Sequence, residues 1–405
     1  MVSANDKITL GFIGVYRRGM DLIGEFLEQP DVEIGAVCDI YDKHLDAGIE
    51  KAGGNAKRYK DFRKLLEQKD IDAVVIASPP HWHPLMSIYA CQAGKDVYCE
   101  KPISLFVNEA RAMAKTARDT KRVTQVGTQI HSVDNFRRVV EIVRSGILGK
   151  ITSARTYFNT NEYPGGIGRH ENGTPPEGLD WDMWLGPQAE EPYNPGVFES
   201  LRYFKRYIGS WLNELGPHIM DLPFWAMDTG EPLAVSASGG RFTADDMSDI
   251  PDTMDVIWEY PDFQMTWMNN TGNGFNFGFS NPPDKGRRHG TIFQGAKGTL
   301  LANYFEHTIV PEGDSLLGVP LPEPSIPSSP GQVREFLDAI KTRQQPLCNF
   351  DYHLPIAVAI NLAHVSLEVG RKLHWDAEKG EVAGDSEANA LLTPVYRKPW
   401  VLPEI

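Results

Sequence analysis

Residues 7–19 read KITLGFIGVYRRG and decide the fold of the N-terminal part of the chain. Residues 7–13 form a short apolar run rich in branched side chains, which predicts a buried strand. Gly14 and Gly19 follow, and apolar residues then recur at helical spacing between positions 20 and 27. This order of strand, glycine turn and helix is typical of a sheet that holds a nucleotide at a helix N-terminus.

The same alternation continues to about residue 150. Apolar runs at 32–38, 71–77, 96–99 and 123–126 predict further strands, and helical periodicity at 62–66, 85–92, 109–118 and 136–144 predicts the helices between them. Strands that alternate with helices in this way indicate a doubly wound parallel sheet. We therefore expect an α/β protein whose residues 1–150 form a Rossmann domain.

The pattern changes at residue 151. Strand-like runs at 151–158, 233–242, 254–260, 264–268 and 290–293 are separated by turns rather than by helices. They predict an α+β domain over residues 151–405, with an open, mostly antiparallel sheet that is covered on one face by helices. We expect the last helix, at about 355–372, to pack back toward the N-terminal domain.

The bulk composition narrows the classes of function. The formal net charge of −14 argues against nucleic acid as the main partner, because phosphate binding favours a basic surface. No apolar run approaches the roughly 18 residues of a membrane span, so we expect no membrane partner. The first residues contain no apolar signal core, which predicts a cytoplasmic location, with the periplasm as the alternative if an export signal was removed.

The glycine turn departs from the dinucleotide fingerprint G-x-G-x-x-G at one position. Gly14 and Gly19 match, whereas Tyr16 stands at the second glycine, where the phenol ring must point away from the ligand or cover it. Asp39 ends the second predicted strand, where its carboxylate would bind the adenosine ribose and repel a 2′-phosphate. NAD is therefore preferred to NADP, although Asp39 could also merely end the strand or cap a helix.

Five further segments make the chain similar to the Gfo/Idh/MocA family, named after glucose–fructose oxidoreductase, inositol dehydrogenase and rhizopine catabolism. These segments are ASPPHWH at 77–83, AGKDVYCEKP at 93–102, QVGTQ at 125–129, SGILGK at 145–150 and ELGPHIMD at 214–221. Each is weak alone, but together they span most of the chain.

This resemblance implies an NAD-dependent oxidoreductase that acts on a carbohydrate, with a second domain that binds substrate and supports a homo-dimer or homo-tetramer. Lys101 would contact substrate and cofactor, His218 would be the acid/base, and Glu214 stands where many relatives have aspartate. The cofactor-binding residues expected on these motifs are Gly14, Tyr16, Arg17, Arg18, Gly19, Asp39, Ser78, Pro79, His81, His83, Glu100, Lys101 and Gln129.

The residue types fit that chemistry. An imidazole ordinarily titrates near pH 6.5, so His218 could accept the proton of an alcohol, with Glu214 one helical turn earlier to orient it. Lys101 would stabilise the developing alkoxide charge. A capping or buried structural histidine is the competing interpretation of His218. We expect no metal, because the His81/His83 pair has no acidic or cysteine partner at a convincing spacing.

The segment 163–194 is irregular and rich in aromatic and charged residues, which predicts a functional loop. Its candidate substrate contacts are Tyr163, Arg169, His170, Trp181 and Asp182. Aromatic rings beside charged groups suit a sugar, which has apolar faces and a polar rim, but they suit a subunit contact equally well. Arg202, Tyr203, Lys205 and Arg206 could contact substrate, but a solvated basic helix face is the favoured interpretation of this segment.

Three functions remain open on the sequence. The leading hypothesis is a sugar or polyol dehydrogenase. The first alternative is a redox-neutral glycosidase or lyase that forms a transient keto-sugar and does not release its cofactor, which a crowded site around Tyr16 would suit. The second alternative is a non-catalytic NAD-binding regulator, which the retention of both Lys101 and His218 disfavours.

Overall fold

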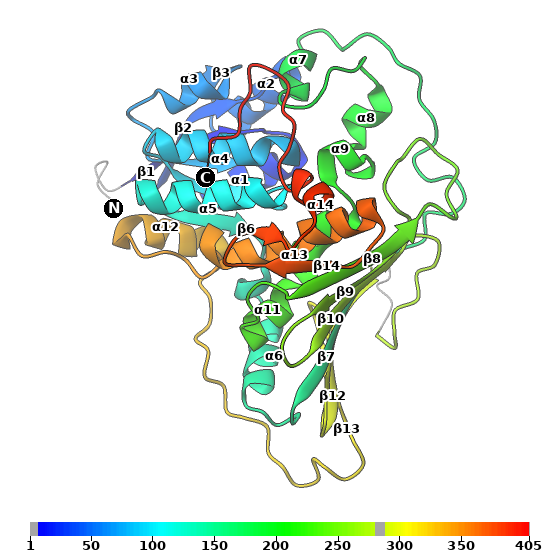
Figure 1. Ribbon diagram of the computed structural model, residues 1–405. Helices are drawn as coiled ribbons and strands as arrows, with labels where there is room; N and C mark the ends of the chain where they lie inside the picture. The colour runs from blue at the N-terminus through cyan, green and yellow to red at the C-terminus, as the bar shows by residue number, and fades with distance from the viewer. Residues whose placement is uncertain (1–6, 280–287, 405) are drawn as a thin grey trace.

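Two β-sheets organise the chain, one in each half of the sequence (Figure 1). The computed structural model describes residues 7–279 and 288–404. Within these residues, no helix is both long and apolar enough to cross a membrane.

The first sheet has six parallel strands in the order β3-β2-β1-β4-β5-β6. This is the strand order of dinucleotide-binding sheets, and it confirms the predicted Rossmann fold. The strands are β1 (Ile8–Ile13), β2 (Val32–Cys38), β3 (Lys57–Tyr59), β4 (Ala73–Ile76), β5 (Asp96–Glu100) and β6 (Thr124–Gly127).

Helices cover both faces of this sheet (Figure 1). Those from the N-terminal half are α1 (Arg17–Leu27), α2 (Asp42–Lys51), α3 (Phe62–Leu66), α4 (His83–Gln92) and α5 (Val107–Thr120), whereas α6 (Asp134–Arg144) packs on α11 (Asp221–Met227) in the core of the second half. Helix α12 (Gln332–Thr342) arrives from the other half of the chain and packs Phe336 against Phe26 and Tyr98. Arg334 on this helix also pairs with Asp31 at 2.8 Å.

The second sheet has nine strands in the order β13-β12-β11-β7-β10-β9-β8-β14-β15. Every pairing is antiparallel except that of β7 with β10, which confirms the prediction of a mostly antiparallel sheet. The strands are β7 (Ile151–Asn159), β8 (Ala234–Gly240), β9 (Thr253–Glu259), β10 (Gln264–Asn270), β11 (Arg288–Gly295), β12 (Gly298–Ala302), β13 (His307–Pro311), β14 (Leu373–Asp376) and β15 (Glu381–Val382).

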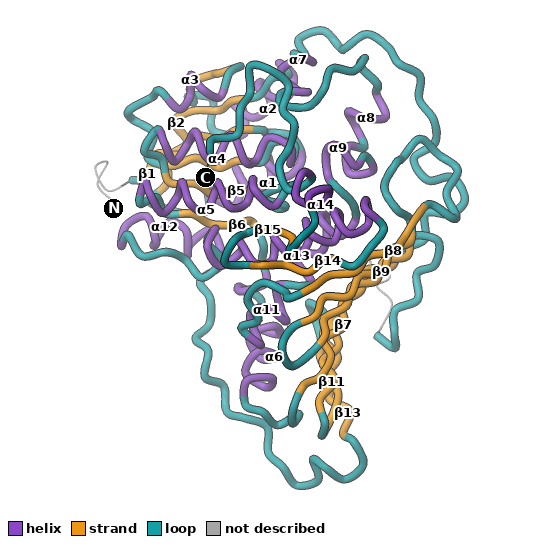
Figure 2. The backbone as a smooth tube through the Cα atoms, viewed as in Figure 1, coloured by secondary structure: helices purple, strands orange, loops and turns teal. Residues whose placement is uncertain are grey.

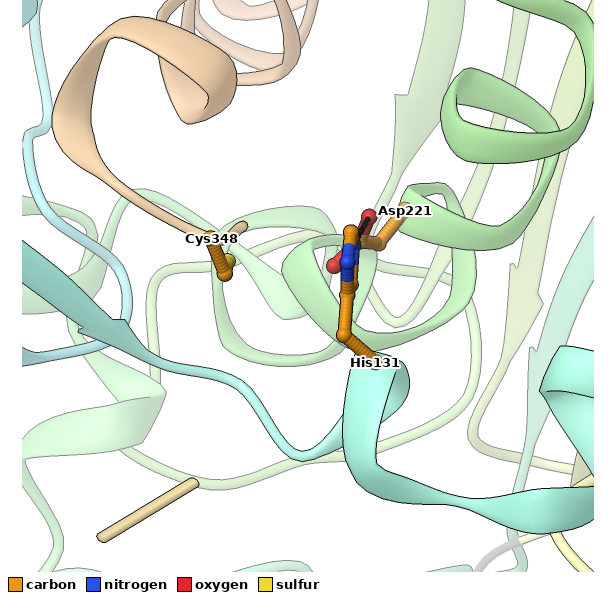
Figure 3. A group of neighbouring side chains, drawn as sticks. All are labelled: His131, Asp221 and Cys348. Carbon is orange, nitrogen blue, oxygen red and sulfur yellow. Dashed lines mark hydrogen bonds and ion pairs between the residues drawn. The ribbon is translucent and has the colours of Figure 1, made fainter. Parts of the chain in front are cut away.

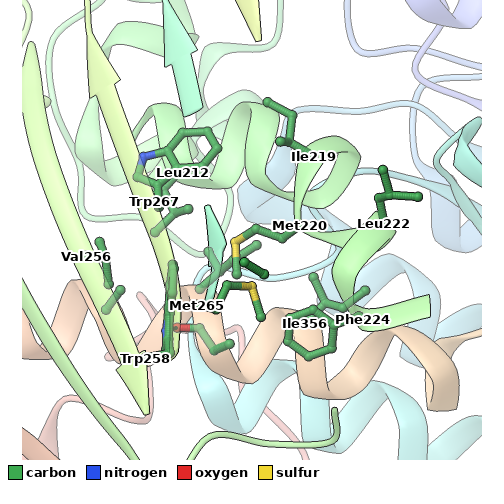
Figure 4. Packing of buried hydrophobic residues seen from close by; sticks show 14 of the residues in the cluster. Leu212, Ile219, Met220, Leu222, Phe224, Val256, Trp258, Met265, Trp267 and Ile356 are labelled. Carbon is green, nitrogen blue, oxygen red and sulfur yellow. Dashed lines mark hydrogen bonds between the residues drawn. The ribbon is translucent and has the colours of Figure 1, made fainter. Parts of the chain in front are cut away.

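The core of the second half lies between one face of this sheet and helices α10 (Trp211–Ile219), α11 (Asp221–Met227) and α13 (Phe350–Val369) (Figure 4). Trp258 and Trp267 project from the sheet into this core and are completely buried. The indole N–H of Trp258 donates to the carbonyl of Ala359 at 2.8 Å, so α13 is held to the sheet by a hydrogen bond as well as by packing.

Helix α13 also contacts the first sheet, because it packs on α5 and β6 as well as on β8. It begins at Phe350, five residues before the expected start, since the side chain of Asn349 accepts from the backbone N–H groups of Asp351 and Tyr352. It ends at Gly370, whose φ of +67° favours glycine. Just before the helix, the carbonyl of Cys348 accepts from the N–H of Val126 at the end of β6.

Residues 178–199 cross from the second half to the first sheet (Figure 2); we call them the cover segment. The N–H of Asp42 donates to the carbonyl of Gly178 at 3.2 Å, and the N–H of Asp180 donates to the carbonyl of Ile40 at 3.1 Å. The segment contains the short helices α7 (Trp181–Leu185) and α8 (Pro195–Glu199). After it come η4 (Leu201–Tyr203), α9 (Lys205–Ile208) and α10, and α14 (Ser386–Ala390) lies near the C-terminus.

Candidate active site

A cleft of about 490 Å³ lies at the carboxyl ends of strands β1, β2, β4 and β5. Its walls come from both halves of the chain: the turns after these strands, the cover segment, η4 and α10. The volume lies in the range of cofactor and small-molecule sites, and the carboxyl edge of a parallel sheet is where such sites form.

The glycine turn forms one end of the cleft. Gly14 has a φ of +84°, and a Cβ on it would lie 2.6 Å from the backbone nitrogen of Ser78, so the turn requires glycine. A Cβ on Gly19 would lie 2.1 Å from the carbonyl oxygen of Gly14, so this glycine lets α1 pack close to the turn. The N-terminus of α1 therefore faces the cleft with its unpaired amides, as diphosphate binding requires.

Asp39 follows β2 at the same edge of the sheet. Its two carboxylate oxygens accept from the N–H groups of Val15 and Tyr41, each at 2.9 Å. Burial raises the pKa of Asp39, while these two N–H groups act in the opposite direction. Each carboxylate oxygen keeps a second acceptor site, so this arrangement fits the ribose hydroxyls of NAD.

Tyr16 caps α1 and points toward the cover segment. Its ring stacks on His44, with the ring centroids 4.4 Å apart and the planes at 13°, and the ring of Phe198 lies parallel to His44 at 6.4 Å. The Tyr16 hydroxyl donates to Oε2 of Glu199 at 3.3 Å. The phenol ring therefore joins the dinucleotide turn to the cover segment.

Lys101 follows β5 and reaches across to α10. Its Nζ donates to the carbonyl oxygen of Glu214 at 2.9 Å and to Oε2 of the same residue at 3.1 Å. Both side chains are largely buried, with 14% and 13% of their surface exposed. The ring nitrogens of His83 lie 2.8 and 2.7 Å from the carbonyl oxygens of Ser78 and Pro102, which fixes the backbone beside Lys101.

Glu100 lies directly beneath this lysine. Burial raises the pKa of Glu100, and the guanidinium of Arg18 opposes that rise, since its Nε lies 2.8 Å from Oε1. Oε2 accepts from the N–H of Lys101 at 3.2 Å. A Cβ on Gly127 would lie 2.7 Å from Oε1, so the glycine after β6 leaves room for the Glu100 carboxylate.

His218 lies one helical turn after Glu214 on α10, and both line the cleft with Lys101. The Oη of Tyr304 lies 3.0 Å from Nδ1 of His218. Burial raises the pKa of Tyr304, so this partner is a neutral phenol. The hydrogen bond holds the ring through Nδ1, and Nε2 is the nitrogen at the other side of the imidazole.

The expected cofactor-binding residues divide into two groups. Those that line the cleft are Gly14, Tyr16, Arg17, Arg18, Asp39, Ser78, Pro79, His83, Glu100, Lys101 and Gln129. Gly19 lies under the turn, and His81 is buried behind the wall, with Nε2 2.9 Å from the carbonyl oxygen of Trp184. His81 also packs against the ring of Tyr207, so its contacts are with the protein on this side of the cleft.

The expected substrate contacts lie outside the cleft lining. Tyr163 is 63% exposed, and Arg169 is paired with Asp245. His170 lies 3.3 Å from the carbonyl oxygen of Ile167, Trp181 stacks on Trp184 and donates to the carbonyl of Glu191, and Asp182 pairs with Arg397. The cover segment lines the cleft instead through Met183, Trp184, Phe198 and Glu199.

Other lining residues were absent from the sequence-based set. Among them are His44, Lys60, Phe198, Glu199, Arg202 and Ile208. The segment after Asp39 had a usable signal, because residues just beyond the second strand of a dinucleotide fold surround the adenosine. Glu199 and Arg202 had no such signal in the sequence, because their approach to the cleft depends on how the second half of the chain folds over the first.

One group of described residues could bring three donor atoms to a metal: His131, Asp221 and Cys348, all buried and within 4.8 Å of one another (Figure 3). The Asp221 carboxylate already lies 3.0 Å from Nε2 of His131 and accepts from the hydroxyls of Thr128 and Tyr352. Burial alone would raise the pKa of Asp221, but its neighbours hold it below its usual range. We interpret the group as a hydrogen-bonded network that joins η3 (Ile130–Ser132), α11 and α13.

Two family models match the chain. The first, described as an oxidoreductase family with an NAD-binding Rossmann fold, matches residues 8–128. The second, described as the oxidoreductase family C-terminal alpha/beta domain, matches residues 131–248 and 284–402.

The individual proteins to which the chain is similar share at most about a third of their residues with it over the aligned parts. A glycosyl hydrolase family 109 protein of Shewanella pealeana is 31% identical over 162 residues, which are 37% of this chain and 35%, or about a third, of that relative. GenD2 from gentamicin A biosynthesis, solved in complex with NAD, has a TM-score of 0.67 at 18% identity over 92% of this chain and 97% of that chain. Levoglucosan dehydrogenase, solved with NADH and levoglucosan, has a TM-score of 0.63 at 17% identity over 91% of this chain and 99% of that chain.

The two solved structures show a common fold. The two family models cover most of both halves of the chain and agree with the six-stranded sheet and its glycine turn. The chain therefore belongs to the Gfo/Idh/MocA family of oxidoreductases, in which the N-terminal half is an NAD-binding Rossmann fold.

Proposed function

We propose that the protein is an NAD-dependent oxidoreductase that oxidises or reduces a secondary hydroxyl or ketone of a sugar, polyol or glycoside. One observation carries the proposal. The ammonium of Lys101 binds Glu214, one helical turn from His218, in the cleft that also contains the glycine turn and Asp39. A dinucleotide site and a lysine–histidine pair thus share one cavity, as hydride transfer from an alcohol requires.

Bound NAD would supply the hydride acceptor, held by the glycine turn and Asp39. Lys101 donates hydrogen bonds through Nζ and would hold the substrate oxygen, where its charge stabilises a developing alkoxide. His218 would remove the hydroxyl proton. Nε2 is the unprotonated nitrogen, and can act as the base, in the tautomer whose Nδ1–H donates to Tyr304 Oη.

The role proposed for Glu214 is positioning. Its carboxylate and its own carbonyl oxygen both bind Lys101 Nζ, which fixes the ammonium relative to His218 on the same helix. An ammonium has three donors, so one N–H is left for a substrate oxygen after these two bonds are made. The Glu214 carboxylate reaches Lys101 Nζ at 3.1 Å from the position where the resemblance implies aspartate in many relatives.

A second candidate is the redox-neutral glycosidase or lyase. It is favoured by the 31% identity to a glycosyl hydrolase family 109 protein and by the contacts of Tyr16 with the cover segment, which would slow cofactor exchange. In this reaction bound NAD would supply the acceptor and later the donor of one hydride. His218 would take the hydroxyl proton and return it, while the sugar would lose a C–H proton together with the leaving group beside the transient ketone and then add water. Lys101 and His218 serve both candidates.

Incubation of the protein with NAD and a panel of sugars and aryl glycosides tests the proposal. Net accumulation of NADH indicates the dehydrogenase, whereas release of the aglycone without net NADH indicates the redox-neutral enzyme. Binding of NAD without turnover on any member of the panel, or a complete lack of NAD binding, would contradict both. The matched variant is Lys101→Met, which keeps the bulk of the side chain and removes its charge.

Three broader assignments accompany this function. We infer that residues 1–150 bind NAD, and that residues 151–405 bind substrate and form a homo-dimer or homo-tetramer through the open sheet. Support for the second inference comes from the outer face of the sheet, where Ile257 is 43% exposed. Cytoplasmic location, with the periplasm as the alternative, remains a prediction from the sequence.

A further inference from the structure

Arg202 is the member of the basic segment 202–206 that faces the cleft. It lies in η4, is half-buried and lines the cleft together with Glu199 and Ile208. Lys205 and Arg206 are exposed and pair with Glu368 and Glu191. The solvated basic face expected for this segment therefore applies to Lys205 and Arg206, whereas Arg202 turns inward.

Arg202 differs from the other cations of the cleft in having no protein partner. Within residues 7–279 and 288–404 it makes no hydrogen bond or ion pair. Three other lining cations are paired with carboxylates: Arg18 with Glu100, Lys60 with Asp42 and Lys101 with Glu214. A half-buried guanidinium without a counter-charge is unfavourable, and a bound anion would relieve that cost.

The arginines of the dinucleotide turn are already occupied. Arg18 binds Glu100 and Glu25, at 2.8 and 2.7 Å. Arg17 donates through Nε to Tyr16 Oη and lies over the same ring, with Cζ 5.0 Å from its centroid. Arg202 is therefore the lining guanidinium to which the described residues offer no hydrogen-bond partner.

We propose that Arg202 is the anion receptor of the cleft and binds a phosphate or carboxylate group of the bound ligand through its two-pronged guanidinium. The inference rests on the proposed function, because it assumes that the cleft holds NAD and a sugar. Two ligands can supply such a group: the dinucleotide, through its diphosphate, and the sugar, through a carboxylate or phosphate substituent. Planar guanidinium groups suit both anions, because two parallel N–H groups match two oxygens.

Position along the chain is compatible with either source. Arg202 is three residues after Glu199, which binds Tyr16 at the dinucleotide turn. Arg202 also lies near the start of α10 in space. The next residue, Tyr203, packs edge-on against Trp211 at the start of that helix, with ring centroids 5.4 Å apart. The helix then carries Glu214 and His218 into the same cleft.

The test compares Arg202→Gln and Arg202→Lys with Arg206→Gln, a control in the same segment that removes an exposed, ion-paired guanidinium. Calorimetry gives the Kd of NAD for each variant. The NAD-loaded proteins are then titrated with glucose, glucuronate and glucose 6-phosphate, so that neutral and anionic sugars are compared on one ring. Thermal melts of each variant show whether the fold is retained.

We expect Arg202→Gln to weaken binding of its anion by about tenfold to a hundredfold, as for a lost charged hydrogen-bonded pair. Arg202→Lys should recover part of this loss, and Arg206→Gln should behave as the wild type. Weaker NAD binding identifies the diphosphate as the anion. Loss of the preference for an anionic sugar, with NAD binding unchanged, identifies the substrate.

Unchanged affinities for NAD and for all three sugars in both Arg202 variants would overturn the inference. If Arg202→Gln does not fold, Arg202→Lys decides, because it keeps the charge but loses the two-pronged geometry and should still weaken binding severalfold. The readout is binding rather than turnover. If the Arg202 variants bind more weakly but the wild type turns over no substrate, only the proposed function is refuted. If the wild type turns over substrate normally and the Arg202 variants bind as tightly as it does, only this inference is refuted.

Discussion

Replacement of Tyr16 by glycine restores the dinucleotide fingerprint and removes the contact with the cover segment, so it separates two roles of this side chain. If Tyr16 covers the cofactor, Tyr16→Gly loses the hydrogen bond to Glu199 and the stack on His44. A hydrogen bond to a carboxylate contributes about 1.5 to 3 kcal/mol, and an aromatic pair about 1 kcal/mol. Tyr16 is 42% exposed, so solvent screening reduces the first contribution to about 1 kcal/mol.

The sum of about 2 kcal/mol corresponds to NADH dissociation that is about 30-fold faster in Tyr16→Gly than in the wild type. Tyr16→Phe keeps the stack and loses only the hydrogen bond, so about fivefold is expected for it. Stopped-flow displacement of NADH by excess NAD, followed by NADH fluorescence, measures both rates. Slower dissociation from Tyr16→Gly would refute the reasoning, since it would mean that the phenol obstructs the diphosphate and that the fingerprint glycine is worth more than the cover.

Three other predictions concern the catalytic pair, its support and the stability of the fold. Lys101→Ala and His218→Ala should each lower kcat by about a thousandfold while the Kd of NAD, measured by titration, stays within a few-fold of the wild type. Tyr304→Phe removes the hydrogen bond that holds the imidazole of His218 through Nδ1, so kcat should fall severalfold while the Kd of NAD stays near that of the wild type. Burial raises the pKa of Glu109 to about 7, above its ordinary value of 4.5, so the neutral form is favoured in the folded state. This contribution to the free energy of unfolding, about 3 kcal/mol, is present below about pH 4.5 and is lost as the pH rises through about 7. Glu109→Gln should flatten that dependence in urea melts recorded across this range, and an unchanged slope would contradict the assignment.

The first sheet was predictable because its signals are local. Each buried strand is a continuous apolar run, and the Gly14 turn announces the first strand–helix unit. Helix α2 lies outside the predicted elements, because it buries only Leu45 and Gly48 among ten mostly polar residues. Strand β3 has three residues and no buried side chain, so it gives no apolar pattern to read.

The residues of the cleft also differ in how far the sequence alone could place them. Asp39 and Lys101 follow strands directly, so the sheet topology alone places them at one edge. The cover segment has aromatic residues throughout, and its composition does not distinguish those that face the cleft from those that pack together. Trp181 and Trp184 are three residues apart and stack on each other, yet only Trp184 lines the cleft.

The proposed catalytic residues, Lys101 and His218, meet at the interface between the two halves of the chain. Lys101 belongs to the first sheet and His218 to a helix on the second, so neither half contains the site. Helix α13 holds the two halves together, since it packs on both, and Asp221 beside the catalytic helix binds Tyr352 on α13 and His131 from the first half. We expect this interface to hold the ammonium and the imidazole in place before substrate binds, an arrangement that lowers a barrier by preorganisation. It follows that Tyr352→Phe, which lies outside the lining of the cleft, should lower kcat more than it alters the Kd of NAD.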